Sequence, residues 1–192
     1  MFEPWIRDIL LASQNGDTRS FEKLVETFQG YAFSLASRFL GNEEDAQDVV
    51  QETFIRVWKH LPEFDYRCKF TTWMYRIVTN LCLDRAKSLK RKEKILSYNP
   101  VDSAGNLWEN VTEDIDLEDK SIKEELAGII TGLAAELTPR QRAVFVLRDL
   151  QDVSIAEAAQ ILGISNNSVK SNLCHARQNI KKRFEQLEKK QG

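Results

Sequence analysis

The polar side chains of residues 165–177, SNNSVKSNLCHAR, have the types that hydrogen-bond to the edges of DNA bases. An asparagine amide pairs with adenine, a lysine ammonium pairs with guanine, and both lysine and arginine bind phosphates. On a helix, the exposed face near the N-terminal end would present Asn166, Asn167, Lys170, Ser171, Cys174 and His175. Arg177, Lys181, Lys182 and Arg183 follow at positions suited to phosphates. The segment therefore has the chemistry of a DNA-recognition helix, although its centre is less basic than expected.

The residues that precede this segment have the spacing of a helix-turn-helix. Ser154 and Glu157 form a capping box that begins a helix. Ala159 is small where two helices must approach closely, and Gly163 lies at the turn, where a positive φ favours glycine. Val169 falls on the buried face of the second helix. Together these positions favour a DNA-binding helix-turn-helix over a structural helix hairpin.

The rest of the chain also has helical periodicity, and no run alternates as a strand would. One apolar stripe comprises Phe21, Leu24, Val25, Phe28, Ala32, Leu35 and Phe39, and a second comprises Ala46, Val49, Val50, Phe54, Val57, Trp58 and Leu61. Asn42 and Asp45 predict the cap of the second helix, and Pro62 predicts its end. A third helix should begin near Thr71. The fold class is therefore all-α.

Periodicity is lost between the helical segments, which divides the chain into two domains. Residues 95–122 are rich in Asp, Asn, Ser and Glu and contain Pro100 and Gly105. Residues 138–141, TPRQ, then combine a threonine cap, a proline at the first helical position and a glutamine three residues after the cap. We predict two small helical domains, 1–94 and 123–192, joined by an acidic flexible linker, 95–122.

Charge is segregated along a chain whose formal net charge is only -2. Residues 1–63 hold 6 Lys and Arg against 11 Asp and Glu, whereas residues 64–94 hold 9 against 3. Residues 95–137 hold 2 against 10, and residues 138–192 hold 10 against 5. Two basic blocks on an acidic chain indicate two separate contacts with polyanions, although each block alone is also typical of a solvated helix face.

Several other classes of protein are disfavoured by composition and motifs. A hydrophobic content of 42% is too high for wholesale disorder, the longest apolar stretch is too short for a bilayer span, and no secretory leader is apparent. We expect a cytoplasmic protein without membrane insertion. Its three cysteines are odd in number and show no CxxC pair, so we expect reduced thiols and no metal site. Glycine-rich phosphate loops, GxSxG and HExxH are absent from the sequence, so we expect no catalytic residues, no cofactor and no enzyme.

Two long blocks of the chain resemble a known family. DAQDVVQETFIRVWKHLPEF followed by FTTWMYRIVTNLCLDRAK resembles region 2 of bacterial extracytoplasmic-function (ECF) sigma factors. LTPRQRAVFVLRDLQDVSIAEAAQILGISNNSVKSNLCHARQNIKKR resembles region 4 of the same family, and the blocks follow in family order. The resemblance implies a promoter-specific initiation factor that binds core RNA polymerase and promoter DNA. It assigns sigma region 2 to the first domain and sigma region 4 to the second.

The resemblance also implies a polymerase contact on the helix that starts near Asp45. In the family this helix docks on the clamp helices of the largest polymerase subunit. The matching polar face here, and our predicted core polymerase-binding set, is Asp45, Asp48, Gln51, Glu52 and Arg56. Without the resemblance, this face would be interpreted as an ordinary solvated one.

Residues 64–70, FDYRCKF, match the family's specificity loop, which captures a flipped base of the minus-10 element while the strands open. An extruded base needs an aromatic or apolar pocket and polar groups for its pairing edge, and the strand beside it needs cations. The predicted minus-10 set is Phe64, Tyr66, Arg67, Lys69, Tyr75, Arg76, Asn80 and Arg85. By hydrophobic pattern alone, Phe64, Phe70 and Trp73 are more typical of core residues.

Region 4 of the family reads the minus-35 element as duplex DNA. By position, the predicted minus-35 set is Asn167, Lys170, Ser171, Cys174, His175 and Arg177. The family frequently has TVKSRLHRAR where this chain has SVKSNLCHAR, so Asn172 and His175 replace two usual arginines. A good bidentate base contact is worth about 1–3 kcal/mol, so we expect a changed minus-35 preference rather than lost promoter use.

The family resemblance also suggests roles for the linker and for a regulator. Residues 102–125 match in position the segment that threads the RNA exit path, although a simple tether would need no such role. Members of the family are commonly held inactive by an anti-sigma factor, which we expect as a partner. A flexible linker would allow a closed inhibited arrangement and an open polymerase-bound one.

Two alternatives remain open from the sequence. The chain could be a free-standing helix-turn-helix regulator whose first 90 residues sense a ligand or dimerise, and it would then bind an operator without polymerase. The basic block after the polymerase-type helix argues against that. Cys174 and His175 could form a redox or metal sensor, but helix neighbours point about 100° apart and no further ligand lies close in sequence.

Overall fold

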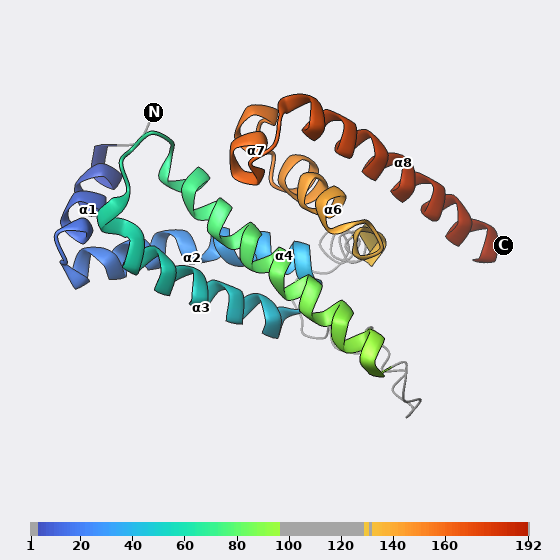
Figure 1. The fold of residues 1–192 in the computed structure, drawn as a ribbon, viewed down its shortest axis with the longest axis horizontal. Coiled ribbons are helices and arrows are strands. Elements are labelled where there is room, and N and C mark those ends of the chain that lie inside the picture. The colour runs from blue at the N-terminus through green and yellow to red at the C-terminus, as the bar shows by residue number, and fades with distance from the viewer. Residues whose placement is uncertain (1–3, 97–128, 131, 192) are drawn as a thin grey trace, which may run out of the picture.

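A computed structural model describes residues 4–96, 129–130 and 132–191 of the chain (Figure 1). The described elements are α1 Pro4–Gln14, α2 Thr18–Leu40, α3 Glu43–His60, the 3₁₀ turn η1 Leu61–Glu63, α4 Phe70–Leu96, α6 Pro139–Phe145, the π-helical turn η2 Val146–Leu150, α7 Ile155–Leu162 and α8 Asn166–Gln191. The described residues contain no strand, which confirms the all-α prediction. The linker predicted at 95–122 lies almost entirely outside the described residues.

The predicted helix boundaries rest on short-range signals, and the structure confirms them. The Asn42 side chain accepts a hydrogen bond from the Asp45 amide at 2.9 Å, which caps α3, and the α3 helix ends just before Pro62. Both predicted capping boxes are present, at Thr138–Gln141 and at Ser154–Glu157. Each box pairs amides that the first helical turn would otherwise leave without an acceptor.

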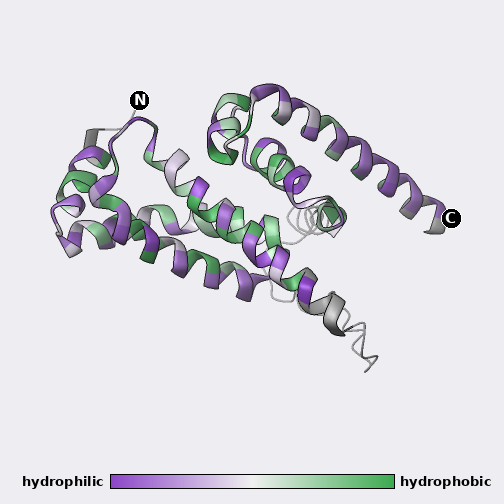
Figure 2. Cartoon of the chain, in the orientation of Figure 1, coloured by the Kyte–Doolittle hydropathy of each residue, from purple (hydrophilic) through white to green (hydrophobic). Residues whose placement is uncertain are grey.

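Helices α1 to α4 form an N-terminal module, and α6 to α8 form a C-terminal module. In the first, α2, α3 and α4 pack on one another and α1 packs on α2. In the second, α6 and α7 both pack on α8, which continues past the other helices towards the C-terminus (Figure 1). Figure 2 shows that this outer part of α8 is mostly hydrophilic.

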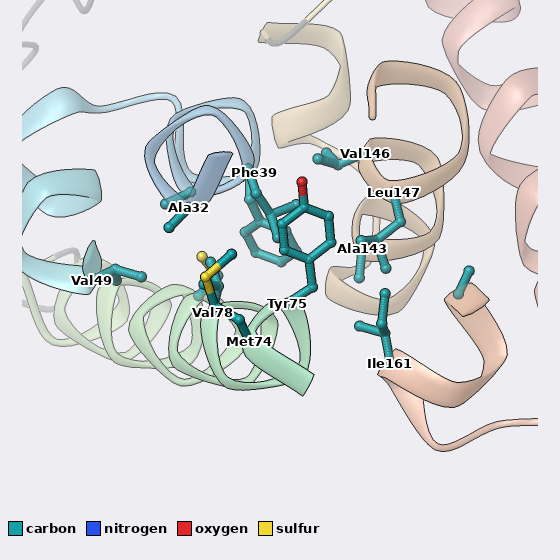
Figure 3. Close-up of a cluster of buried hydrophobic side chains, with 14 of the residues drawn as sticks. Ala32, Phe39, Val49, Met74, Tyr75, Val78, Ala143, Val146, Leu147 and Ile161 are labelled. Carbon is teal, nitrogen blue, oxygen red and sulfur yellow. The ribbon is translucent and has the colours of Figure 1, made fainter. Parts of the chain in front are cut away.

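An apolar seam joins the two modules, a feature that the sequence did not predict. Phe39 of α2 and Tyr75 of α4 lie against Ala143, Val146 and Leu147 of the C-terminal module, with Ile161 of α7 nearby (Figure 3). All six side chains are buried and belong to one continuous core cluster. We use "the seam" for these six residues. The two predicted domains therefore share a core in this arrangement.

A buried arginine crosses between the modules beside the seam. Arg142, only 7% exposed, donates hydrogen bonds to the carbonyls of Ala134 at 3.0 Å, of Phe39 at 3.2 Å and of Ala135. Phe39 lies at the C-terminal end of α2, where the helix leaves carbonyls unpaired and carries partial negative charge. Burial lowers the pKa of Arg142, and the three carbonyls that accept its hydrogen bonds compensate its charge.

We expect Arg142→Met to lower the free energy of unfolding by about 2 kcal/mol. A hydrogen bond to a charged group contributes about 1.5–3 kcal/mol, and relief from burying the charge offsets part of the loss. Urea denaturation would measure the change. Arg140→Met is the matched control, because Arg140 is exposed two residues away and should alter the midpoint little. Equal midpoints for the two variants would contradict this account.

Candidate nucleic-acid and polymerase interfaces

The predicted polymerase-binding residues lie along the outer side of α3. Asp48 and Gln51 are exposed, and Arg56 donates to Glu52 one helical turn before it at 2.7 Å, with both side chains nearly half exposed. Asp45 differs, because its side chain is only 15% exposed and is held by Arg85 of α4. Four of the five side chains are therefore presented to solvent together, and Asp45 lies behind them.

Two apolar side chains share this face of α3 and were missing from the predicted set. Ile55 is 49% exposed, and Trp58 is 36% exposed with its ring 4.7 Å from Phe21. At 100° per residue, Ile55 falls between Asp48 and Gln51 around the helix axis. The sequence placed Trp58 in the apolar stripe, and in the structure it lies at the exposed edge of that stripe. Ile55 falls outside the apolar stripe of α3, so the sequence alone could have predicted that this isoleucine is exposed.

Arg85 connects two sets that were predicted to have different partners. It was predicted to contact minus-10 DNA, whereas Asp45 and Asp48 were predicted to contact polymerase. In the structure the Arg85 guanidinium binds the Asp45 carboxylate and lies 3.5 Å from Asp48. The hydrogen bond and charge of Asp45 raise the pKa of Arg85. Arg85 therefore fixes α4 against the start of α3 and has less freedom to reach a phosphate.

The remaining minus-10 residues divide into buried and exposed members. Phe64 and Tyr75 are buried, at 6% and 9% exposed, and burial raises the pKa of Tyr75. Phe64 packs among Tyr66, Phe70 and Trp73, as expected of a core residue, and Tyr75 lies in the seam. The side chains that remain outside are Tyr66 in part, Arg67, Lys69, Arg76 and Asn80.

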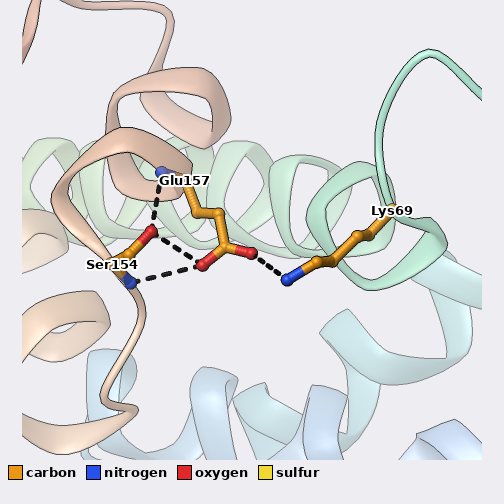
Figure 4. Close-up of polar contacts among 3 residues, drawn as sticks. All are labelled: Lys69, Ser154 and Glu157. Atoms are coloured by element: carbon orange, nitrogen blue, oxygen red, sulfur yellow. Dashed lines mark hydrogen bonds and ion pairs between the residues drawn. The ribbon is translucent and has the colours of Figure 1, made fainter. Parts of the chain in front are cut away.

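Two of the three cations in this exposed group, all but Arg67, contact the C-terminal module. The Lys69 ammonium lies 2.6 Å from the Glu157 carboxylate, which also completes the capping box with Ser154 (Figure 4). The Arg76 guanidinium donates to the backbone carbonyl of Gln160 at 2.8 Å. The Lys69 bond, followed by the Ser154 bond, lowers the pKa of Glu157. Helix α7 therefore covers the side of α4 on which these cations lie.

The predicted minus-35 residues form an exposed row on α8. Asn167, Lys170, Ser171, Cys174 and His175 are all exposed, while Val169, Leu173 and Ala176 on the opposite side are buried. Gly163 adopts φ 63° at the turn before α8, as predicted. The two helices therefore have the local form of a helix-turn-helix with its second helix open to solvent.

Two side chains of α8 have partners that the sequence did not predict. Asn172 donates to the Ser168 carbonyl in its own helix at 2.8 Å, so it turns away from the exposed row. Arg177 binds Asp149 of η2 through two hydrogen bonds, at 2.8 and 2.6 Å, and their contact raises its pKa. The Asp149 carboxylate fixes the guanidinium beside the middle of α8. Arg177 would have to leave or share this partner to bind a phosphate.

Comparisons with known proteins place both modules in one family. The family model "Sigma-70 region 2" matches residues 24–92, and "Sigma-70, region 4" matches residues 128–180. The ECF RNA polymerase sigma factor SigW of Bacillus subtilis is 32% identical over 190 residues, which cover 96% of this chain and 100% of SigW. This chain belongs to the ECF sigma factors. Each match lies within one predicted domain, and the exact domain boundaries remain predictions.

Solved structures show the same fold as this ECF sigma factor. CnrH, in a complex with the cytosolic domain of CnrY, has a TM-score of 0.65 at 24% identity and covers 93% of this chain and 96% of CnrH. The sigma factor RpoE of Bartonella quintana, in a complex with the anti-sigma factor NepR, has a TM-score of 0.65 at 17% identity, with 88% and 98% covered.

Other predicted features can be located in the part of the chain that the structure describes. None of its helices is long and apolar enough to cross a membrane. In the same residues, no cluster of three or more His, Cys, Asp or Glu side chains is arranged to hold a metal ion. The three cysteines are free thiols, with Cys174 exposed and Cys82 buried, and burial raises the pKa of Cys82 to about 12.

We expect Glu157→Lys to loosen the contact between α7 and α4, because it places a third cation beside Lys69 and Arg76. An exposed ion pair contributes at most about 1 kcal/mol, and reversal adds repulsion of similar size. Small-angle scattering at low ionic strength should give a larger radius of gyration than that of the wild type.

Two matched variants separate charge from capping in this experiment. Glu157→Gln keeps a capping residue and removes only the attraction, so it should expand the molecule less than Glu157→Lys. Ser154→Ala removes the cap and leaves the carboxylate, so it should not expand the molecule. Superimposable scattering from wild type and Glu157→Lys at all salt concentrations would contradict the role given to this pair.

Proposed function

We propose that this ECF sigma factor binds core RNA polymerase and directs it to promoters, reading the minus-35 element as duplex through α8 and opening the minus-10 element with residues 64–70 and α4. Family membership and the exposed row on α8 support this function most directly. The row combines the amide of Asn167, the ammonium of Lys170 and the imidazole of His175 on a helix that begins after a tight turn. Such groups discriminate bases in a major groove.

The polymerase contact is assigned to the outer face of α3. Asp48, Gln51 and Glu52 supply charge and hydrogen bonds. Ile55 supplies apolar area between Asp48 and Gln51, and Trp58 adds apolar area at the edge of the face. Interfaces of this kind combine a small apolar core with a polar rim. Asp45 and Arg56 support the rim, the first through Arg85 and the second through Glu52.

The minus-10 assignment requires a rearrangement between the modules. Lys69 and Arg76 bind α7, and Tyr75 lies in the seam, so a DNA strand could reach these residues only after α7 has moved away. The arrangement in this structure, with α7 packed on α4, is therefore the closed state that precedes polymerase binding. In an open state, both DNA-binding surfaces would be free to bind DNA. An anti-sigma factor that stabilises the closed state is the partner expected to inhibit it.

The proposal makes the chain a cytoplasmic binding protein rather than an enzyme. Nucleotide addition would be performed by the polymerase, and this chain would need only to bind DNA and separate its strands. The alternative of a free-standing regulator is not favoured, because region 2 and region 4 are both present in this chain.

Transcription on fragmented genomic DNA tests the function directly. Purified core polymerase with this protein should produce new RNA 5′ ends, each preceded by a shared two-part sequence, and core polymerase alone should not. Sequencing of the 5′ ends would also give the minus-35 preference. Tight DNA binding by the protein alone, without new start sites, would instead favour the free-standing regulator.

Ile55→Ser should weaken binding to core polymerase about 10-fold, because burial of an isoleucine side chain contributes about 1.5–3 kcal/mol. Fluorescence titration of labelled protein with core polymerase would measure the affinity. Tyr31→Ser is the matched control, since Tyr31 is an exposed apolar side chain on α2, away from this face. Equal losses for the two variants would reject the assigned face.

A further inference from the structure

Residues 64–70 connect η1 to α4 and include most of the exposed minus-10 candidates, so their backbone conformation decides where those side chains point. Tyr66 has φ 61°, in the left-handed region that residues other than glycine rarely adopt. Its ring lies 4.9 Å from the ring of Phe64. Because this conformation is disfavoured for an isolated tyrosine, contacts from elsewhere must hold it.

Those contacts come from one side chain at the end of α1. The Gln14 amide donates from Nε2 to the Leu61 carbonyl at 3.0 Å and to the Phe64 carbonyl at 2.8 Å. Its Oε1 accepts a hydrogen bond from the Tyr66 hydroxyl at 2.7 Å. A single amide thus binds η1 at one point and the beginning of the loop at two, from about 50 residues away in sequence.

The chemistry of the three partners determines the orientation of the amide. Both carbonyl oxygens only accept, so the NH₂ group must face them, and Oε1 is left for the hydroxyl. A tyrosine phenol has an ordinary pKa of about 10 and is therefore a protonated donor at neutral pH, and burial raises the pKa of Tyr66 further. Among common side chains, only an amide supplies two donors and one acceptor without charge at this position.

We propose that Gln14 is a positioning residue for the minus-10 loop: it fixes Tyr66 in its left-handed conformation and so sets the direction in which Tyr66 and Arg67 meet the opened strand. The inference rests on the proposed function and extends it to α1, which contributes no residue to the predicted DNA-binding sets. Gln14 itself does not contact DNA.

Gln14→Met tests the inference, because methionine has similar length but makes none of the three hydrogen bonds. Promoter templates that carry each of the four bases at one minus-10 position would be transcribed with core polymerase. The ratio of initiation at the preferred base to that at the others should fall about fivefold, which corresponds to the loss of about one hydrogen bond. Polymerase affinity should change less than twofold. Amide exchange in residues 64–70 should accelerate.

Two further variants distinguish positioning from general damage. Tyr66→Phe removes only the hydroxyl, and in combination with Gln14→Met it should add less than its separate effect, because both changes break the same bond. Asn15→Leu is the matched control: Asn15 is an exposed amide just after α1, and its side chain donates to the Leu11 carbonyl of that helix rather than to the loop. It should leave the base ratio unchanged.

The outcomes separate the inference from the proposed function. If the wild type initiates and folded Gln14→Met has the same base ratio as the wild type, the inference is overturned and the proposed function stands. Equal reductions at all four bases, together with weaker polymerase binding, would also overturn it, because a general structural defect has no base preference. Failure of wild type to initiate at any promoter would refute the proposed function and the inference with it, even if amide exchange showed that Gln14 holds residues 64–70 in place.

Discussion

The seam between the two modules is the constraint on which the other surfaces depend. Helix α4 packs on both modules through different faces. Met74 and Val78 face the N-terminal module, whereas Tyr75 points towards α6 and η2 (Figure 3). Neighbouring residues on a helix point about 100° apart, so one helix can complete two cores at once. Burial of a large apolar side chain contributes about 1.5–3 kcal/mol, and α4 cannot be exposed to DNA without losing that contribution.

Polar contacts at the border of the seam differ in strength because they differ in burial. Arg142 is buried and satisfies carbonyls of both modules, so its loss would leave polar groups without partners in a dry site. Lys69 with Glu157, and Arg76 with Gln160, remain partly in water, where ions and polyanions compete with them. The module contact is therefore held mainly by burial. A nucleic acid could break its outer polar contacts by replacing Glu157 and the Gln160 carbonyl as the partners of the two cations.

The two DNA-binding surfaces are not equally accessible in this arrangement. The row on α8 faces solvent, whereas Lys69 and Arg76 contact α7, the first helix of the same helix-turn-helix. Movement of α7 would change both surfaces together, because α7 and α8 pack on each other around Ile161, Val169 and Leu173. Duplex recognition and strand opening are thus mechanically connected through one small core.

The sequence by itself determined the helices, their caps and the order of the two regions. Capping boxes, Gly163 at the turn and the exposed row on α8 depend on residues within a few positions of one another, so short patterns specify them. Only the tertiary structure decided that Tyr75 is buried, that Arg85 binds Asp45, that Arg177 binds Asp149 and that Gln14 holds the loop. These contacts join residues 28 to 52 positions apart, or join two modules, and helical periodicity carries no information about which faces meet.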